Sequence, residues 1–163
     1  MTGTQLDDTA VRTALAGVAD PEIPAISVLE LGLISSIEIV NDRVKVECLP
    51  TFVGCPALDV IREDIEEALI AIGAIPEVTF VYSPPWTSDR ITAEGREKLH
   101  GYGLAPPAST RSTSIELLIL SSGECPYCGS KDTVLESPFG PTACRSICYC
   151  RSCRNPYERF KNV

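Results

Sequence analysis

The amino-terminal two thirds of the chain carry a hydrophobic pattern whose period changes from that of a helix to that of a strand. Apolar residues first recur at spacings of four and three, at Val11, Leu15 and Val18. This spacing predicts a short helix, capped by Asp8, that ends before Asp20-Pro21. Residues 33–40 are apolar and β-branched, and residues 41–42 supply a turn before a run with alternating apolar residues, Val44, Val46 and Cys48. The alternation predicts a β-hairpin with these last side chains on its buried face.

A second helix and further elements follow the hairpin. Pro56 suits the first position of a helix, where its missing N–H costs nothing. Apolar residues then recur at helical spacing, at Leu58, Ile61, Ile65, Ala68 and Ile72. The opposite face is charged, and Gly73 is expected to end the helix. Residues 78–82 predict a third strand, and residues 92–102 a further helix. The order of elements favours an α/β (α+β) fold in which a small sheet is packed by helices on one face.

Composition divides the 163 residues into two unlike parts. Residues 105–114 lack apolar periodicity and are interpreted as a linker between a domain at 1–104 and a module at 115–163. The first 104 residues hold 17 acidic and 7 basic residues, a net charge of −10, whereas the rest hold 5 and 7, a net charge of +2. Six of the eight cysteines lie in the second part. Because a module of 49 residues rarely buries enough apolar surface to fold alone, we expect it to fold around a metal.

Several observations bound the setting of the protein. The longest apolar run, residues 68–75, is far shorter than the ~20 residues that a membrane-spanning helix needs. The amino terminus has neither the basic leader nor the apolar stretch of a secretory signal, so a cytoplasmic location is expected. In that compartment cysteines bind metals or react as thiols more often than they form disulfides. His100 is the single histidine, which argues against a histidine-rich metal site.

The strongest chemical signal is a pair of C-x-x-C motifs, residues 125–128 (CPYC) and 150–153 (CRSC). Each short turn presents two thiolates at the spacing of a tetrahedral ligand set, and an intervening hairpin can bring the two turns together. The motifs predict a closed Zn²⁺ site with four ligands, Cys125, Cys128, Cys150 and Cys153. An iron–sulfur cluster and a pair of disulfides are the alternatives. Cys144 and Cys148 are either additional metal ligands or packed thiols.

Cys55 forms a second candidate site because it directly precedes Pro56 at the predicted helix start. Unpaired N–H groups and the helix dipole lower the pKa of a thiol there, which predicts a reactive thiolate or a soft-metal ligand. A buried structural cysteine is the alternative. Asp20 and Glu22 add carboxylates that could reach a metal beside Cys55, although turn chemistry alone also explains the Asp-Pro pair. Cys48 is expected in the core, and a bond or shared metal with Cys55 stays open.

Basic and aromatic residues interleave around the second C-x-x-C motif, which raises the alternative of a zinc ribbon that binds nucleic acid. The net charge of −8 and the acidic first part disfavour that partner. Four thiolates with one Zn²⁺ would add about −2 to the local charge and disfavour it further.

Several short motifs together resemble the MIP18 (DUF59) family of iron–sulfur assembly factors, over about residues 8–104. They are residues 20–24 (DPEIP), 27–34 (SVLELGLI), 54–56 (GCP) and 84–87 (PPWT). Two motifs in the tail, residues 139–144 (FGPTAC) and 150–157 (CRSCRNPY), extend the resemblance to the PaaD-like family of phenylacetate degradation proteins. Each motif is weak alone, and their ordered combination is specific.

The resemblance implies a MIP18-like sheet domain with a zinc-ribbon-like module, into which the paired C-x-x-C motifs fit. It implies an accessory protein of the phenylacetyl-CoA ring-1,2-epoxidase (monooxygenase) system, which assists assembly or maintenance of an iron–sulfur or iron centre rather than turning over substrate. Oxygenase or reductase components are the implied partners, and a homodimer stays open. Cys55 is the implied reactive thiolate, with Asp20 and Glu22 near it. Cys144 matches a further cysteine of such tails, whereas Cys48 and Cys148 depart from the pattern. A general iron–sulfur assembly or carrier factor is the alternative function.

Overall fold

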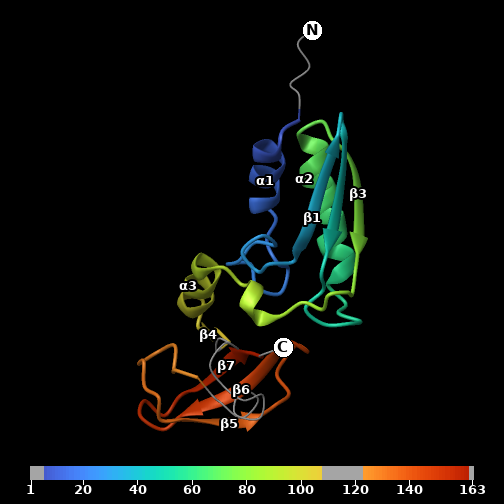
Figure 1. The fold of residues 1–163 in the computed structure, drawn as a ribbon. Helices are drawn as coiled ribbons and strands as arrows, with labels where there is room; N and C mark the ends of the chain where they lie inside the picture. The colour runs from blue at the N-terminus through green and yellow to red at the C-terminus, as the bar shows by residue number, and fades with distance from the viewer. Residues whose placement is uncertain (1–5, 108–122, 162–163) are drawn as a thin grey trace. The chain divides into compact units, whose positions relative to one another are not determined.

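The computed structural model describes residues 6–107 and 123–161 and divides the chain after Trp86 into two compact units (Figure 1). The first unit contains α1 (Asp8–Ala16), β1 (Ile34–Val40), β2 (Arg43–Cys48), α2 (Leu58–Ala71) and β3 (Ile75–Phe80). The second unit contains η1 (Ser88–Arg90), α3 (Ala93–Gly101), β4 (Leu104–Ala105), β5 (Thr133–Ser137), β6 (Arg145–Cys150) and β7 (Pro156–Phe160). The fold class predicted from the hydrophobic pattern, a mixed α+β chain with small sheets, is confirmed.

The first unit is built on a three-stranded sheet in the order β1-β2-β3. β1 runs antiparallel to β2, and β3 runs parallel to it. The predicted hairpin and its buried face are confirmed, because Val44, Val46 and Cys48 are all fully buried. Residues 43, 45 and 47 point to the opposite, more exposed face. Figure 1 shows α2 against one face of this sheet with α1 beside it, as the pattern predicts.

The helices of the first unit differ from the predicted ones at their ends and in one detail of their apolar stripe. The cap of α1 is Asp7 rather than Asp8, and its side chain accepts a hydrogen bond of 2.7 Å from the Ala10 N–H. α2 begins at Leu58, and its buried residues are Ile61, Ile65 and Leu69. Ile72 is instead 36% exposed, because α2 ends at Ala71 and Ile72 is the cap residue that follows its last turn. Within the described residues, no helix is both long and apolar enough to cross a membrane.

β3 begins at Ile75, earlier than the predicted residue 78, and ends at Phe80 rather than residue 82. The parallel register explains both ends, since Arg43 pairs with Ile75 and Cys48 with Phe80, so that β3 matches β2 along its whole length. The loops that follow Cys48 and Phe80 therefore leave the sheet at the same edge.

The second unit is a four-stranded sheet in the order β4-β7-β6-β5. β5, β6 and β7 pair antiparallel, and the short β4 pairs parallel to β7. The predicted helix at 92–102 is confirmed as α3, whose cap Thr92 accepts a hydrogen bond from the Gly95 N–H. Inward-facing side chains of this sheet form a small core that includes Ala105, Cys148 and Tyr157.

The domain boundaries expected from composition, at 1–104, 105–114 and 115–163, stay predictions. Residues 108–122, which include most of the expected linker, lie outside the described residues. The strand pairing adds that Leu104 and Ala105 pair with Glu158 and Arg159 of β7 and are both buried. The start of the expected linker is therefore part of the four-stranded sheet β4-β7-β6-β5, which is called the ribbon below.

Candidate functional site

Four cysteines of the second unit come together as a metal-binding group. The Sγ atoms of Cys125, Cys128, Cys150 and Cys153 all lie within 4.8 Å of one another. The Cys125 and Cys153 sulfurs are 3.7 Å apart, and the Cys128 and Cys150 sulfurs are 3.5 Å apart. Tetrahedral bonds of about 2.3 Å to one ion place sulfurs about 3.8 Å apart, so the donor set fits a single Zn²⁺. No disulfide is present among these four cysteines.

Each pair of ligands sits in a turn that the backbone holds. In the first turn the Gly129 N–H donates to the Cys125 carbonyl at 2.9 Å, and Gly129 adopts a φ of 70°. In the second, the Cys150 N–H donates to the Asn155 carbonyl at 3.0 Å, and Arg154 adopts a φ of 60°. The backbone N–H of Cys153 also donates to the Cys150 sulfur, which lowers the pKa of Cys150 to about 7. The turn thus favours a thiolate at Cys150, the form that binds metal. At Cys128 the Ser130 N–H lowers the pKa, but burial and the three neighbouring thiols outweigh it and raise the pKa to about 12.

The two further cysteines of the tail do not join this group. Cys148 lies on β6 two positions before the ligand Cys150, is fully buried, and has its pKa raised by burial. Cys144 lies in the turn before β6, with its sulfur 3.1 Å from the Thr142 hydroxyl. Of the two alternatives left open by the sequence, packed thiols therefore fit both residues better than extra ligands.

Cys55 lies in the loop between β2 and α2, half-buried, three positions before the helix begins. Gly54, with a φ of 78°, makes the turn that presents it. Burial raises the pKa of Cys55, while a hydrogen bond from the Ala57 N–H lowers it, and the charges of Glu22 and Asp20 raise it. The lowered pKa expected from the helix dipole is therefore wrong. Because α2 starts only at Leu58, a single N–H reaches the sulfur and is outweighed.

Asp20 and Glu22 approach Cys55 closely enough for their charges to act on it, as the sequence predicts. Asp20 is only 8% exposed, and one of its carboxylate oxygens accepts hydrogen bonds from the N–H groups of Glu22 and Ile23, both at 2.9 Å. The same side chain thus folds the loop and places negative charge beside the thiol. Cys48 is a fully buried core thiol whose pKa is raised by burial to about 12.

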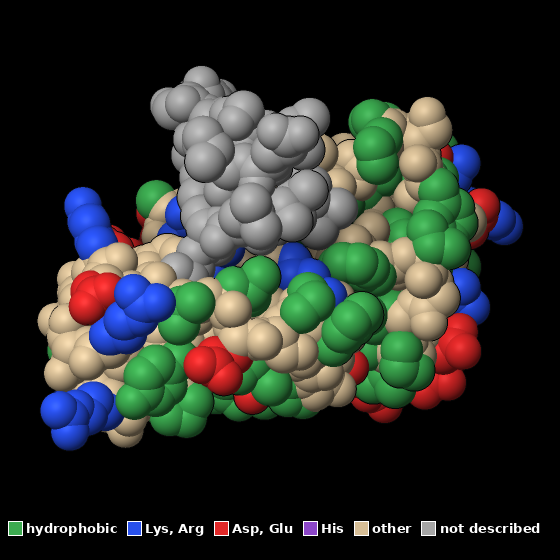
Figure 2. All heavy atoms as spheres, turned by 90° about the horizontal axis from the view of Figure 1, so that it is seen from below, with side chains coloured by type: hydrophobic (Ala, Val, Ile, Leu, Met, Phe, Trp, Pro, Cys, Tyr) green, Lys and Arg blue, Asp and Glu red, His purple; other side chains and the backbone are tan. Residues whose placement is uncertain are grey.

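Basic side chains of the ribbon lie close to carboxylates. Arg145 pairs with Glu158 at 2.7 Å, Arg151 with Asp132 at 3.7 Å, and Lys131 with Glu124 at 3.4 Å. On the face shown in Figure 2, basic, acidic and hydrophobic side chains are interspersed among the described residues. The expectation that nucleic acid is not a partner stays a prediction, and this arrangement agrees with it.

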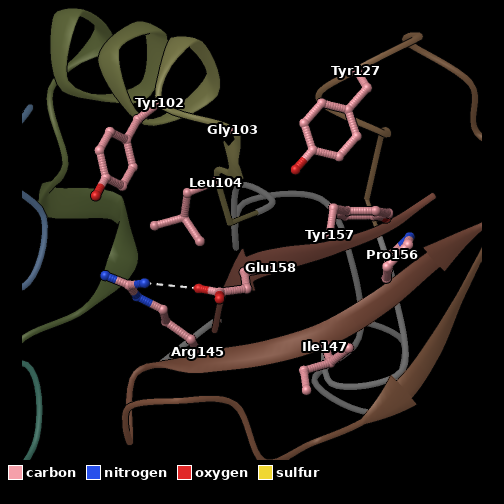
Figure 3. A pocket seen from close by; sticks show the side chains of 9 residues that line it. All are labelled: Tyr102, Gly103, Leu104, Tyr127, Arg145, Ile147, Pro156, Tyr157 and Glu158. Atoms are coloured by element: carbon pink, nitrogen blue, oxygen red, sulfur yellow. Dashed lines mark hydrogen bonds and ion pairs between the residues drawn. The ribbon is translucent and has the colours of Figure 1, made fainter.

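The second unit contains a pocket with a volume of about 460 Å³ (Figure 3). This pocket was not predicted from the sequence. Three tyrosines line it, Tyr102, Tyr127 and Tyr157. They come from three separate segments, so no local pattern connects them. The one available signal is that Tyr127 stands between two metal ligands in the CPYC motif.

Two protein families match separate parts of the chain. Residues 8–80 match the family described as iron–sulfur cluster assembly protein, and residues 120–161 match the PaaD zinc beta ribbon domain. The chain is 36% identical over 150 residues to a putative 1,2-phenylacetyl-CoA epoxidase subunit of Escherichia coli K12, covering 91% of this chain and 89% of that protein. It is 30% identical over 85 residues to the Fe-S protein maturation auxiliary factor YitW of Bacillus subtilis, covering 50% of this chain and 82% of that protein.

Two solved structures resemble more than half of the chain. A DUF59 domain of unknown function from Bacillus anthracis is 25% identical with a TM-score of 0.52, covering 56% of this chain and 90% of that one. The conserved hypothetical protein TM0487 from Thermotoga maritima is 34% identical with a TM-score of 0.50, covering 61% of this chain and 98% of that one.

Proposed function

This chain belongs to the PaaD family of 1,2-phenylacetyl-CoA epoxidase subunits, and from this premise we propose that it assists assembly or maintenance of an iron–sulfur or iron centre in such an epoxidase. The relatives that resemble its first unit are named as Fe-S protein maturation factors, which supports an accessory role. Components of the oxygenase or its reductase are the proposed partners.

The observation that carries the proposal is the joint placement of Cys55, Asp20 and Glu22. The thiol lies in a half-exposed loop that follows β2, at the edge of the sheet where the parallel strands β2 and β3 both end. Ligands of α/β proteins commonly bind at this edge. Cys55 supplies a sulfur donor that suits iron, and the negative charges of Asp20 and Glu22, which act on this thiol, attract such a cation.

The raised pKa of Cys55 favours reversible binding of iron cargo at this site. Near neutral pH the thiol keeps its proton, and the carboxylates beside it attract a cation. As a sulfur–iron bond forms to the cargo, the proton leaves to solvent, and it returns to the sulfur when the cargo passes on. A site of this kind holds its cargo briefly, as a maturation factor needs, rather than keeping it as a resident cofactor.

The four-cysteine group has a different proposed role. Zn²⁺ bound there supplies a cross-link between the two turns, and Cys125, Cys128, Cys150 and Cys153 would hold it. All four ligands come from protein, so no position stays open for substrate. The ribbon would therefore be a structural module. It would also contact the partner component of the oxygenase system.

Co-expression with the oxygenase and reductase components tests the proposal. Iron and acid-labile sulfide are measured in each purified component, with the wild-type chain, with Cys55→Ser, with Cys48→Ala or with no chain. We expect Cys55→Ser to lower metal content to the level found without the chain, and Cys48→Ala, which removes a buried thiol outside the site, to leave it unchanged. Full metal content with Cys55→Ser removes the thiol mechanism. Full metal content without the chain removes the function.

The general carrier function is a second candidate, favoured by a 36% identity over 104 residues to an iron–sulfur cluster carrier protein of Mycobacterium tuberculosis. This match spans 26% of that protein. A carrier would bind a cluster itself, so anaerobically purified protein would absorb visible light and Cys55→Ser would not. A colourless wild-type protein that still supports the oxygenase favours the accessory function.

A further inference from the structure

The pocket of the second unit has an aromatic and apolar wall. Tyr102, the cap residue that follows α3, is 51% exposed, and Tyr127 is 59% exposed. Tyr157 is buried, and its hydroxyl interacts with Thr133 and Cys148, which leaves its ring as part of the wall. Apolar side chains complete the lining: Leu104, Ile147 and Pro156. Figure 3 shows these side chains around one hollow next to the ribbon strands.

Tyr127 is fixed at the side of this pocket. Its ring lies against Gly103, where an added Cβ would be 3.6 Å from Cε1 and 3.7 Å from the hydroxyl oxygen. The φ of 87° at Gly103 favours glycine, and the ring of Tyr127 lies over this residue at van der Waals distance. Because Tyr127 stands between the ligands Cys125 and Cys128, the metal site sets the position of this wall.

The two charged side chains that line the pocket form one ion pair. Arg145 is the lining cation, and its Nη1 is held by the Glu158 carboxylate at 2.7 Å. The Arg145 side chain is only 11% exposed, whereas that of Glu158 is 36% exposed. The carboxylate is thus the more accessible charge, and it complements a basic group on a ligand.

We propose that this pocket binds an extended, proline-rich segment of a partner protein that carries a basic residue beside its prolines. A polyproline II segment is stiff, has no internal hydrogen bonds and leaves its carbonyl groups free. Exposed tyrosines offer flat apolar surfaces to proline rings and hydroxyls that donate to those carbonyls. Glu158 accepts the basic residue. Because Tyr127 depends on the metal turn, binding also requires an occupied four-cysteine site.

The test uses the full-length, zinc-loaded chain and a fluorescein-labelled peptide of one arginine followed by a run of prolines. A glycine-serine peptide with the same length and charge is the control. Fluorescence anisotropy should show saturable binding of the proline peptide only. Tyr127→Ala and Tyr102→Ala should each weaken binding about tenfold, as loss of an aromatic anchor does. Tyr82→Ala, which removes a tyrosine that is 54% exposed in the first unit, should leave it unchanged.

Zinc content of each variant confirms that its ribbon is folded, and chelation of zinc should weaken binding as much as Tyr127→Ala does. A peptide with leucine in place of arginine should bind less tightly. Equal binding of the glycine-serine peptide, no saturable binding, or full affinity in both tyrosine variants overturns the proposal. So does a preference for single-stranded oligonucleotides that falls steeply with salt. Cys55→Ser should bind the peptide normally, which separates this proposal from the proposed function.

Discussion

Asp20 combines two roles that substitution can separate. Its carboxylate accepts two backbone hydrogen bonds that fold the loop, and its charge raises the pKa of Cys55. Asp20→Ala removes both effects, whereas Asp20→Asn keeps an acceptor oxygen and removes the charge. Hydrogen bonds to a charged group contribute about 1.5–3 kcal/mol each. With Asp20 only 8% exposed, we expect Asp20→Ala to lower the free energy of unfolding of the first unit by about 3 kcal/mol. Asp20→Asn should cost about 1 kcal/mol or less.

Trp86, the single tryptophan, reports on this unit alone. It is 2% exposed, and its indole N–H donates to the Leu31 carbonyl at 3.0 Å. Its fluorescence during urea denaturation therefore measures the stability of the first unit. The rate at which iodoacetamide alkylates Cys55, measured across pH, measures the pKa of the thiol. In Asp20→Asn the removed carboxylate no longer disfavours the thiolate, so the pH profile should move to lower pH. An Asp20→Asn protein as unstable as Asp20→Ala, with an unmoved profile, would refute the electrostatic role.

Further predictions concern the metal, the core thiol and the helix stripe. Cys150→Ser should lose the metal and unfold the ribbon, whereas Cys148→Ser should keep the metal. Elemental analysis measures the metal content and circular dichroism measures folding. A Cys150→Ser protein that is free of metal but still folded would contradict this prediction. At mildly alkaline pH, iodoacetamide should leave Cys48 unmodified because burial raises its pKa to about 12, as peptide mass spectrometry can show. Ile65→Ala should cost about 3 kcal/mol in urea denaturation followed by Trp86 emission. Ile72→Ala, at a position 36% exposed, should cost about 1 kcal/mol or less, and equal losses would contradict the observed stripe.

Features of the fold that depend on neighbouring residues could be predicted from the sequence. The alternation of Val44, Val46 and Cys48 determines which face of β2 is buried, because side chains alternate across a strand. The two C-x-x-C motifs likewise predict the turns that hold the metal ligands, because each turn is formed by residues close together in the sequence. Helix ends were less predictable, since Asp7 and Asp8 are equally suited to cap α1 and only backbone conformation decides between them.

Properties that arise from tertiary contacts could not be read from local patterns. The pKa of Cys55 is raised because the fold buries it and brings Asp20 and Glu22, more than thirty positions earlier in the chain, close to it. The hydrogen bond from the Ala57 N–H, which acts in the opposite direction, is local and is outweighed by burial and the two carboxylates. The tyrosine pocket has no local signal for a similar reason, because its lining comes from the segment after α3, β4, a metal turn, β6 and β7.

The pairing of β4 with β7 has a consequence for the order in which the two units form during translation. All strands of the first unit have been synthesised once Phe80 has emerged from the ribosome, whereas β4 must wait for Pro156–Phe160 before it has a partner. Two metal ligands, Cys150 and Cys153, also emerge only shortly before that strand. Domains generally fold as units from the amino terminus. The thiol loop can therefore be complete on the nascent chain while the ribbon is still open, and zinc capture would then follow the folding of the first unit.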